Sequence, residues 1–268
     1  MIKCGITGFK GNLGKTFIKV NKKFRYIKFK GDVSKKKQLE NWLKKNRFDL
    51  IIHLAAIVPT FEVNNNYKKA LDVNYKGTKY LIDGIKKYQK DISWFFFAST
   101  SHVYPFQRKK ITENNKKKSI SKYGETKLKA EDYILKKFRH SKFNICIGRI
   151  FSIFDNRGKN FFAPSLLNKI QKGPNKMVLE NLIHYRDFLS TKQISKIIFF
   201  LWKKKYSGVI NIGSGKKTDL REVVKFFGNK YKKKVVFKTN KPTYHIADMS
   251  KLKKLGFKNK KLNFGSFF

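Results

Sequence analysis

Residues 2–14, IKCGITGFKGNLG, decide how the rest of the chain is interpreted. A short apolar stretch, Lys3–Thr7, leads directly into three closely spaced glycines, Gly8, Gly11 and Gly14. Glycines at such a strand-to-helix turn let backbone N–H groups approach a diphosphate at the N-terminus of the helix. The spacing G-x-x-G-x-x-G is one residue longer than the G-x-G-x-x-G fingerprint, so the loop alone is also compatible with a simple tight turn.

The composition is strongly basic, but the charge is spread along the chain. Lys and Arg number 63 against 17 Asp and Glu, which gives a formal net charge of +46 over 268 residues. Such a charge is typical of proteins that bind nucleic acid or anionic membranes. Most of the basic residues are Lys, and their runs fall in different predicted elements (Lys35–Lys37, Lys116–Lys118, Lys203–Lys205 and Lys232–Lys234). We interpret them as a solvated surface that reflects A/T-rich codons, and we expect neither nucleic acid nor a membrane as a partner.

Cysteine usage and hydropathy predict a cytoplasmic, soluble protein without a metal. Cys4 and Cys146 fall in apolar, strand-like runs, so we expect buried free thiols in a reducing compartment. No Cys/His spacing of the kind that binds a metal is present in the sequence. The longest apolar run, Ile194–Trp202, is too short to span a bilayer, and Met1–Lys3 leads into the first strand without a signal peptide.

Strands and helices are expected to alternate through the first 151 residues. The expected strands are Lys3–Thr7, Arg25–Phe29, Asp49–Leu54, Ser93–Ala98 and Phe143–Phe151. The expected helices run from Lys15 to near Asn21 and over Lys36–Lys45, Tyr67–Tyr88 and Ser121–Phe138. This alternation predicts an α/β fold with a doubly wound parallel sheet.

The character of the sequence changes after about residue 152, where Gly and Pro become frequent. Shorter elements are expected at Pro164–Lys172, Lys192–Lys203 and Gly208–Ile212. We therefore expect residues 1–152 to form the doubly wound domain. Residues 153–268 are expected to form a smaller, interleaved substrate-binding portion, with elements that return to the edge of the sheet.

A second group of residues predicts chemistry at the carboxyl end of the Ser93–Ala98 strand. Thr100 follows this strand and should face the ligand crevice, while Tyr123 and Lys127 lie four residues apart on one helix face. A phenol with a pKa of about 10 is a poor base at neutral pH, and we expect the ammonium of Lys127 to lower that pKa. Together the three side chains predict a proton-transfer site that interconverts an alcohol and a ketone beside a hydride acceptor.

At these residues the chain resembles the extended short-chain dehydrogenase/reductases, and among them the nucleotide-sugar epimerase/dehydratase group. The similar segments cover nearly the whole chain: Thr7–Gly14, His53–Ala56, Asp72–Thr78, Ala98–Tyr104, Tyr123–Lys127, Tyr185–Phe188, Asn211–Gly215, and Asp248 with Leu255–Phe257. The resemblance implies a Rossmann domain that binds NAD(P). It also implies an enzyme that epimerises a nucleotide-activated sugar, or reduces a keto group on it, in the synthesis of surface-polysaccharide precursors.

The resemblance further implies a role for each matching residue. Tyr123 is the expected acid/base, Lys127 holds the nicotinamide ribose and tunes Tyr123, and Thr100 orients the substrate oxygen. The implied cofactor contacts are Gly8, Gly11, Asn12, Leu13, Gly14, Asp32, Val33, Leu54, Ala55, Ala56, Asn74, Tyr123 and Lys127. The implied substrate contacts are Thr100, Ser101, His102, Ser152 and Arg186, of which Arg186 grips the diphosphate of the sugar nucleotide. The two helices that carry Tyr80 and Ile134 commonly form a dimer interface, which implies a homodimer.

Departures from the family pattern narrow the reaction. The 4,6-dehydratases have Asp-Glu directly after the catalytic Thr, whereas this chain has Ser101 and His102, which disfavours dehydration. His102 is either a second acid/base or a hydrogen-bonding residue.

The choice of cofactor stays open in the sequence. NAD-binding proteins usually have a carboxylate at the end of the second strand, whereas a basic residue there suits the 2′-phosphate of NADP. The expected strand before Asp32 carries Arg25 and Lys28, and Lys30 follows it. NAD is the expected cofactor, with NADP as the alternative. The alternative functions are an NADPH-dependent 4-keto-deoxysugar reductase and a non-catalytic, cofactor- or RNA-binding member of the fold.

Overall fold

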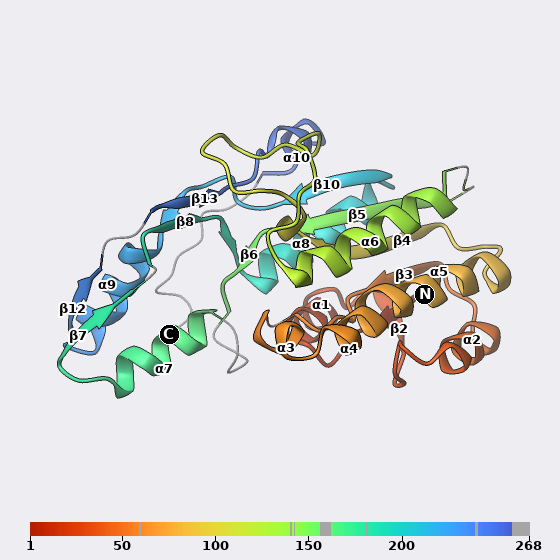
Figure 1. Ribbon diagram of the computed structural model, residues 1–268. Coiled ribbons are helices and arrows are strands. Elements are labelled where there is room, and N and C mark those ends of the chain that lie inside the picture. The colour runs from red at the N-terminus through yellow and green to blue at the C-terminus, as the bar shows by residue number, and fades with distance from the viewer. Residues whose placement is uncertain are drawn as a thin grey trace. The chain divides into compact units, whose positions relative to one another are not determined.

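The computed structural model describes residues 1–58, 60–139, 141, 143–155, 162–180, 182–238 and 241–258 (Figure 1). The chain forms two compact units. The first unit comprises Met1–Pro105, Lys116–Ile150 and Thr191–Ile210. The second comprises Phe106–Asn115, Phe151–Ser190 and the described residues from Asn211 onward. The domain boundary at residue 152 stays a prediction.

The first unit is built on a six-stranded sheet with the strand order β10-β5-β4-β3-β1-β2. Its strands are β1 (Ile2–Thr7), β2 (Phe24–Lys28), β3 (Leu50–His53), β4 (Trp94–Thr100), β5 (Asn144–Ile150) and β10 (Gly208–Ile212). β1 pairs in parallel with β2 on one side and with β3 on the other, and β4 pairs in parallel with β3 and β5. The order of winding reverses at β1, so the predicted doubly wound sheet is confirmed, with its ligand-binding switch point after β1.

Helices cover both faces of this sheet (Figure 1). One group consists of α1 (Asn12–Val20) and α8 (Thr191–Lys203), which pack together. The other consists of α2 (Lys36–Lys45), α5 (Gly77–Tyr88) and α6 (Lys122–Lys137), whose apolar side chains form one core with those of β3, β4 and β5. β4 shows why the strands are buried on both sides, because Phe95 and Phe97 join this core while Trp94 stacks on Phe96 at 5.8 Å.

Most elements lie close to their predicted positions, and two differences affect the site. α1 begins at Asn12 rather than Lys15, because the glycine loop turns directly into the helix and Lys15 N–H donates to the Gly11 carbonyl at 2.9 Å. The helix predicted over Tyr67–Tyr88 consists of α4 (Tyr67–Leu71), the π-helical turn η1 (Asp72–Lys76) and α5. Such π turns are frequent at functional sites. A short helix that the sequence did not predict, α3 (Thr60–Asn65), precedes them.

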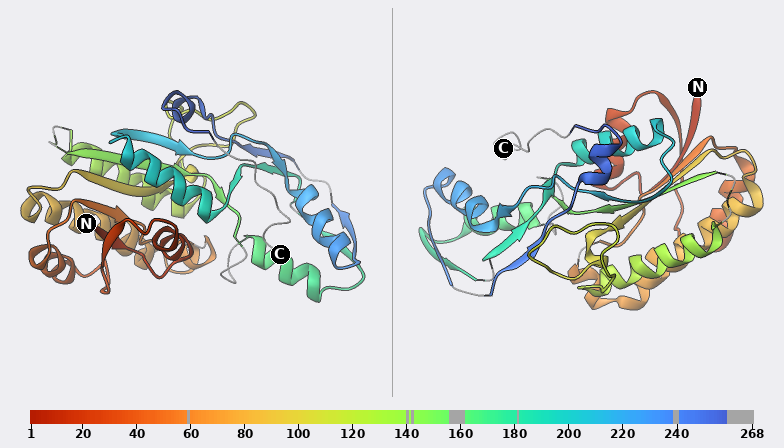
Figure 2. Two further views of the ribbon diagram at one scale, coloured as in Figure 1. Left: turned by 180° about the vertical axis from the view of Figure 1, so that it is seen from behind. Right: turned by 90° about the horizontal axis from the view of Figure 1, so that it is seen from above.

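The second unit consists of small sheets and short helices (Figure 2). Its elements are β6 (Ser152–Ile153), α7 (Phe162–Lys172), β7 (Lys176–Leu179), β8 (His184–Arg186), β9 (Phe188–Leu189), β11 (Thr218–Asp219), α9 (Leu220–Lys230), β12 (Lys234–Phe237), β13 (Thr243–His245) and α10 (Ser250–Lys254). The strands pair as β11-β8-β13, β12-β7 and β6-β9. Buried side chains of α7, β7 and α9 form its core.

A buried carboxylate links the loops of this second unit. Asp187 is 0% exposed and accepts hydrogen bonds from Ser214 N and Oγ at 2.6 Å each, from Gly215 N at 2.9 Å and from Ala247 N at 3.1 Å. Burial raises the pKa of Asp187, and these hydrogen bonds oppose the rise. Asp187 therefore holds three separate backbone segments together directly beside Arg186.

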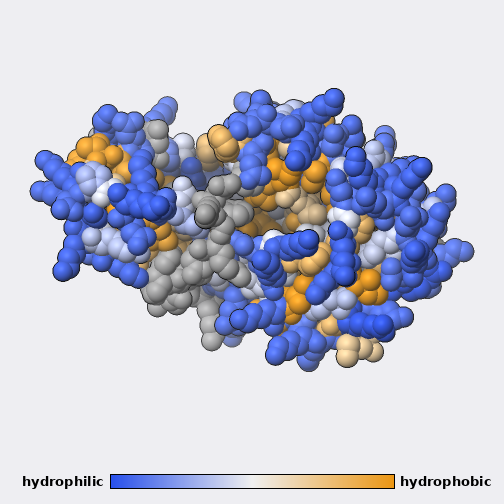
Figure 3. Space-filling view, turned by 90° about the horizontal axis from the view of Figure 1, so that it is seen from below, coloured by the Kyte–Doolittle hydropathy of each residue, from blue (hydrophilic) through white to orange (hydrophobic). Residues whose placement is uncertain are grey.

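The two cysteines are buried as predicted, and one face of the surface is shown by hydropathy in Figure 3. Hydrophilic side chains are spread over the face shown in Figure 3 rather than gathered in a single stripe. Cys4 and Cys146 are buried free thiols, and burial raises the pKa of both. Within the part of the chain that the structure describes, no helix has the length and apolar character needed to cross a membrane.

Candidate active site and cofactor pocket

The glycine loop after β1 combines close backbone packing with one open position. Gly8 has a φ of +70°, and a Cβ there would lie 2.5 Å from Ala55 N. A Cβ on Gly14 would collide with the carbonyl oxygen of Gly8. A Cβ on Gly11 would meet its first described neighbour, the Gly8 carbonyl oxygen, at 3.4 Å. Gly8 and Gly14 are thus required by the fold, whereas a Cβ at Gly11 would meet little of the protein.

The first turn of α1 follows directly from this loop. Gly11 is its N-cap residue, and among the described residues no side chain caps the helix. The N–H groups at the start of an α-helix point away from the helix along its axis, where they can face an anion. The loop and helix therefore suit the diphosphate of a dinucleotide, as predicted from the sequence.

A cavity of about 300 Å³ lies beside the loop. It is lined by Gly8, Phe9, Lys10, Phe29, Lys30, Gly31, Asp32, Val33, Ala55, Ala56, Ile57 and Val73. The predicted contacts Gly8, Asp32, Val33, Ala55 and Ala56 thus meet in one cavity. Its apolar walls suit a flat ring such as adenine. Sequence reasoning missed Phe9, Lys10 and Ile57, although Lys10 stands between two of the glycines.

Asn74 does not line this cavity but holds Ile57, which does. Its side chain accepts from Ile57 N at 2.8 Å and donates to Ile57 O at 2.9 Å and to Thr126 Oγ1 at 3.0 Å. Thr126 in turn donates to the carbonyl of Tyr123 at 2.7 Å. The amide predicted to contact the cofactor therefore clamps the segment after β3 to α6.

His53 connects β1, β3 and α5 in the interior of the first unit. Nδ1 lies 2.6 Å from Thr7 Oγ1, and Nε2 lies 2.9 Å from Thr78 Oγ1. Because Thr78 donates its proton to the carbonyl of Asn74 at 2.7 Å, its oxygen accepts from His53, and Nε2 is the donor. Burial and, to a smaller extent, the charge of Lys127 lower the pKa of His53 to about 3, so the ring is neutral.

This neutral histidine should make folding sensitive to acid. The unfolded chain binds a proton at His53 below pH about 6.5 whereas the folded chain does so below about 3, so stability falls with acidification between these values. We expect a slope of about 1.4 kcal/mol per pH unit from this group. Denaturant titrations between pH 3 and 7 of the wild type and His53→Gln measure it. Parallel curves for the two proteins would contradict the assignment.

Thr100, Tyr123 and Lys127, here called the Thr-Tyr-Lys cluster, are brought together where β4 ends and α6 begins. Ser121 caps α6 by accepting from Gly124 N at 3.1 Å, and the helix begins at Lys122, one residue before Tyr123. Tyr123 is hydrogen-bonded to Thr100, and Lys127 Nζ lies 4.0 Å from the centre of the Phe97 ring. The three residues are 6%, 8% and 1% exposed, so all three side chains are shielded from bulk water.

The 3₁₀ turn η2 (Ser101–Val103) places two further predicted residues beside Tyr123. His102 Nδ1 lies 2.9 Å from Ser121 Oγ, and the His102 ring lies edge-on to Tyr123 at 5.9 Å. Ser101 is buried in the same turn. A Cβ on Gly124 would collide with the carbonyl oxygen of His102. Gly124 in the Tyr-Gly-Glu-Thr-Lys motif therefore permits η2 to approach α6 closely.

The pKa values in the cluster are dominated by burial. Burial raises the pKa of Tyr123, and the hydrogen bond with Thr100 opposes the rise. The prediction that Lys127 lowers the pKa of Tyr123 is therefore wrong, because burial, which favours the neutral phenol, sets the direction of the shift. Burial also lowers the pKa of Lys127 and the charge of Glu131 opposes the fall, so that the pKa is about 7.

Ser152 and Arg186, the other predicted substrate contacts, belong to the second unit. Ser152 pairs with Phe188 between β6 and β9. Arg186 Nη1 donates to the carbonyls of Tyr185 at 2.9 Å and Thr243 at 3.1 Å, and burial lowers its pKa to about 10. Arg186 is thus a partly buried cation held by its own unit. An approach of either residue to the Thr-Tyr-Lys cluster stays a prediction.

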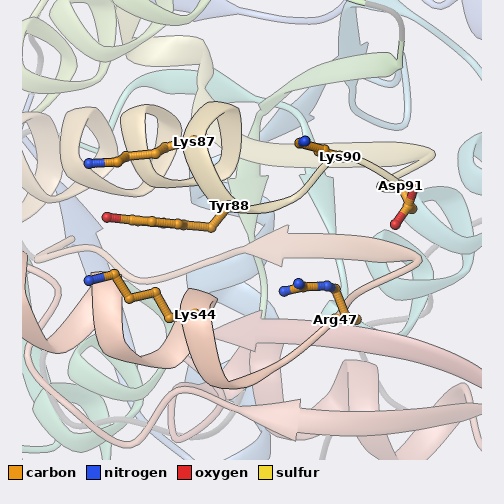
Figure 4. Close-up of a pocket in the computed structure, with 6 residues that line it drawn as sticks. All are labelled: Lys44, Arg47, Lys87, Tyr88, Lys90 and Asp91. Carbon is orange, nitrogen blue, oxygen red and sulfur yellow. The ribbon is translucent and has the colours of Figure 1, made fainter.

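A larger cavity of about 480 Å³ lies elsewhere on the first unit (Figure 4). It is lined by Lys44, Arg47, Lys87, Tyr88, Lys90 and Asp91, and the Tyr88 ring lies between the amino groups of Lys44 and Lys87. These residues come from the ends of α2 and α5 and from the segments that lead into β3 and β4. The cavity is therefore at the amino ends of the strands, opposite the edge where doubly wound sheets bind ligands.

Among the described residues, no group of three or more His, Cys, Asp or Glu side chains could hold a metal ion. The site therefore consists of the glycine loop, the cavity beside it and the Thr-Tyr-Lys cluster. This combination agrees with a nicotinamide cofactor and with proton transfer at a hydroxyl or keto group.

Comparisons with known proteins agree with this site. GDP-6-deoxy-D-talose 4-dehydrogenase of Aggregatibacter actinomycetemcomitans is 28% identical over 224 residues, 80% of this chain and 75% of that protein. dTDP-D-glucose 4,6-dehydratase of Dictyostelium discoideum is 26% identical over 76% of this chain, which spans only 49% of that protein. The structure of RMD from Pseudomonas aeruginosa complexed with NADPH has a TM-score of 0.85 at 20% identity and covers 97% of this chain and 94% of its own.

The match to a protein family covers most of the chain. Residues 6–213 match the NAD dependent epimerase/dehydratase family, from β1 to the turn after β10. The match includes the glycine loop and the Thr-Tyr-Lys cluster, and it confirms the resemblance found in the motifs. The chain therefore belongs to the NAD dependent epimerase/dehydratase family, whose enzymes act with NAD(P).

Proposed function

We propose that this protein is an NAD(P)-dependent enzyme that epimerises a nucleotide-activated sugar or reduces a keto group on it, in the synthesis of surface-polysaccharide precursors. The observation that carries the proposal is the buried Thr-Tyr-Lys cluster at the carboxyl end of β4. Membership of the family and the glycine loop after β1 support it. Ser101 and His102 in place of Asp-Glu disfavour dehydration, although one relative is a dehydratase.

Each residue of the cluster has a role that its surroundings suit. Tyr123 exchanges a proton with the sugar oxygen, and Thr100 holds that oxygen through its hydroxyl. The ammonium of Lys127 favours the charged phenolate of Tyr123 when the proton leaves. The nicotinamide cofactor supplies or takes up the hydride when it is bound. Gly11 and the first turn of α1 hold its diphosphate, and Asp32 and Ala55 border its adenosine end.

The substrate contacts extend this proposal. His102 lies beside Tyr123, and Ser101 precedes His102 in η2; both are proposed to contact the sugar hydroxyls. Ser152 is the proposed contact from the second unit. Arg186, with its partly buried guanidinium, is proposed to bind the diphosphate of the nucleotide, because Arg pairs with phosphate oxygens in a planar, bidentate geometry.

An assay with nucleotide sugars tests the reaction. Native mass spectrometry of freshly purified protein identifies retained NAD or NADP, and UDP-, GDP- and dTDP-sugars, including 4-keto forms, are then added. Epimerisation returns its hydride, so it proceeds without net cofactor consumption, whereas reduction consumes NADPH in equal amount to product. Absence of turnover with every sugar, together with absence of cofactor binding, would overturn the proposed function.

A second candidate, an NADPH-dependent 4-keto-deoxysugar reductase, is favoured by the lysines around the cavity. Lys10 and Lys30 line it, and the amino groups of Lys10 and Lys28 lie 5.9 and 5.7 Å from the Phe9 ring centre. The adjacent carboxylate, that of Asp32, accepts from Ser34 N at 2.9 Å and from Ser34 Oγ at 2.8 Å. Lysine side chains thus border the cavity after β2, while the Asp32 carboxylate is hydrogen-bonded to Ser34 in the same turn.

We expect this chain to bind a 2′-phosphate at these lysines. Charge-assisted hydrogen bonds are worth about 1.5–3 kcal/mol each, so 2′,5′-ADP should bind about 10-fold to 100-fold more tightly than 5′-AMP. Isothermal titration at low salt measures both affinities. The Lys28→Gln/Lys30→Gln variant should lose the difference, and Lys19→Gln/Lys23→Gln, which removes two exposed lysines elsewhere, should keep it. Equal affinities in the wild type would favour NAD and the epimerase.

A further inference from the structure

A third ionisable residue of α6 lies on the same face as the Thr-Tyr-Lys cluster. Tyr123, Lys127 and Glu131 follow one another at four-residue intervals, which places them on one side of the helix. Glu131 is 0% exposed. A buried carboxylate needs charges or hydrogen-bond donors that compensate for the loss of water. The groups that compensate the Glu131 carboxylate therefore indicate which parts of the fold it connects.

The partners of Glu131 come from β5 and from β4. Arg149 of β5 donates from Nε to Oε1 and Oε2 at 3.1 and 3.2 Å, and from Nη2 to Oε2 at 2.7 Å. Its Nη1 donates to the Tyr104 hydroxyl at 2.6 Å. Ser99 of β4 donates to Glu131 Oε1 in a short hydrogen bond. Arg149 is 2% exposed, so this is a buried ion pair with additional hydrogen bonds.

The network reaches the Thr-Tyr-Lys cluster along two routes. Ser99 immediately precedes Thr100, so its hydrogen bond to Glu131 holds the backbone that carries the Thr100 hydroxyl. Lys127 lies one helical turn before Glu131 on α6, and burial lowers its pKa while the Glu131 charge opposes that effect. One carboxylate thus contacts the end of β4 and interacts with the ammonium of the cluster.

We propose that Glu131 is a positioning residue of the Thr-Tyr-Lys cluster: anchored by Arg149, it fixes the end of β4 through Ser99 and supplies a negative charge one helical turn from the Lys127 ammonium. The inference rests on the proposed function, because it assumes that turnover needs a charged Lys127. It assigns to α6 a role beyond carrying Tyr123 and Lys127.

Other titratable groups face the same cluster. His53 of β3 interacts with the charge of Lys127, and His102 of η2 lies against the Tyr123 ring. Arg149 and Tyr104 contact the Glu131 side of the network. Substitution of Glu131 alone leaves all of these groups in place, so a change in pH dependence is assigned to its carboxylate.

The Glu131→Gln variant removes the charge and retains the size of the side chain. Without the carboxylate, nothing on Glu131 opposes the effect of burial, so the pKa of Lys127 should fall further. Lys127 then loses its charge at lower pH, and the alkaline limb of the pH profile of kcat should move to lower pH. A shift of one unit corresponds to a loss of about tenfold in kcat on that limb, with the KM for cofactor unchanged. Asp132→Asn is the control, because Asp132 is exposed on the same helix and pairs with Lys117 at 2.7 Å. Its pH profile should match that of the wild type.

A structural role alone predicts a different result. Removing one partner of a buried ion pair destabilises the protein, whereas removing both is often tolerated. If Glu131→Gln does not fold, Glu131→Gln/Arg149→Met takes its place, and it should show the same displaced limb. The proposal would be overturned if the variant that folds has a lower melting temperature but the same alkaline limb of the pH profile of kcat as the wild type.

A second readout is independent of turnover. The pKa of Lys127 is about 7 in the folded protein against 10.5 as reference, so the unfolded chain binds more protons between these values and stability rises with pH there. Lys127→Met removes this rise. In each of two backgrounds, wild type and Glu131→Gln, the difference between melting curves with Lys127 and with Lys127→Met gives the rise due to Lys127. It should start at lower pH in the Glu131→Gln background. An identical starting pH would refute the inference. If the rise in stability starts at lower pH in Glu131→Gln but no sugar is turned over, the proposed function is refuted while the interaction of Glu131 with Lys127 stands.

Discussion

Replacing Tyr123 by Phe is expected to lower kcat by at least about 100-fold, because general acid–base catalysis contributes about 10²–10⁴-fold. The phenol of Tyr123 is buried, hydrogen-bonded to Thr100 and one helical turn from Lys127. Phenylalanine differs from tyrosine only by the missing hydroxyl. The affinity for the cofactor should change little, since only one hydroxyl is removed. Stopped-flow hydride transfer and fluorescence titration of the cofactor measure the two quantities separately.

The control for this experiment is Tyr133→Phe. Tyr133 lies on the same helix, and its hydroxyl donates to Asp83 at 2.5 Å rather than to the Thr-Tyr-Lys cluster. This variant loses a phenolic hydrogen bond and should retain wild-type turnover. Undiminished turnover in Tyr123→Phe would remove Tyr123 from the mechanism, and with it the basis of the proposed function.

The largest effect on stability is expected from Gly14→Ala. The added methyl group would collide with the carbonyl oxygen of Gly8 and would lie 2.7 Å from the Cα of Phe9. Both neighbours are backbone, so the whole loop must move. Overpacking of this kind costs about 1–3 kcal/mol or more, and the melting temperature should fall accordingly. Thermal unfolding followed by circular dichroism measures it.

Gly11→Ala is the matched variant, three residues away in the same loop. Its Cβ would meet the Gly8 carbonyl oxygen at 3.4 Å, an ordinary contact, and its φ of −71° suits any residue. We expect a stability change within about 1 kcal/mol but a clear loss of cofactor affinity, because the methyl group borders the space proposed for the diphosphate. Equal melting temperatures for the two variants would contradict the distinct roles of these glycines.

Local sequence patterns predicted the elements of the first unit well, because its strands and helices have regular periodicity. α2 and β10 begin and end at the predicted residues, since apolar spacing and adjacent turn residues define them. α3 was missed because a six-residue helix contains too few turns for a periodic pattern. The π-helical turn η1 was missed because it depends on hydrogen bonds that no spacing rule describes.

The site was predicted in part. Thr100, Tyr123 and Lys127 were found because a strand end and a four-residue helical interval are visible in one dimension. The hydrogen bond between Thr100 and Tyr123 agrees with that prediction, while their catalytic roles stay a prediction. The clamp formed by Asn74 was not foreseen, because it depends on contacts with Ile57, 17 residues away, and Thr126, 52 residues away.

The sequence by itself determined the order of strands and helices, the glycine loop and the helix face shared by Tyr123 and Lys127, because these depend on neighbours within one or two turns of chain. Only the tertiary structure decided the protonation chemistry and the support of the site. Burial sets the direction of the pKa shifts of Tyr123 and Lys127, and burial depends on the packing of distant segments. Glu131 meets Ser99 across 32 residues and Arg149 across 18, and folding alone brings these groups together.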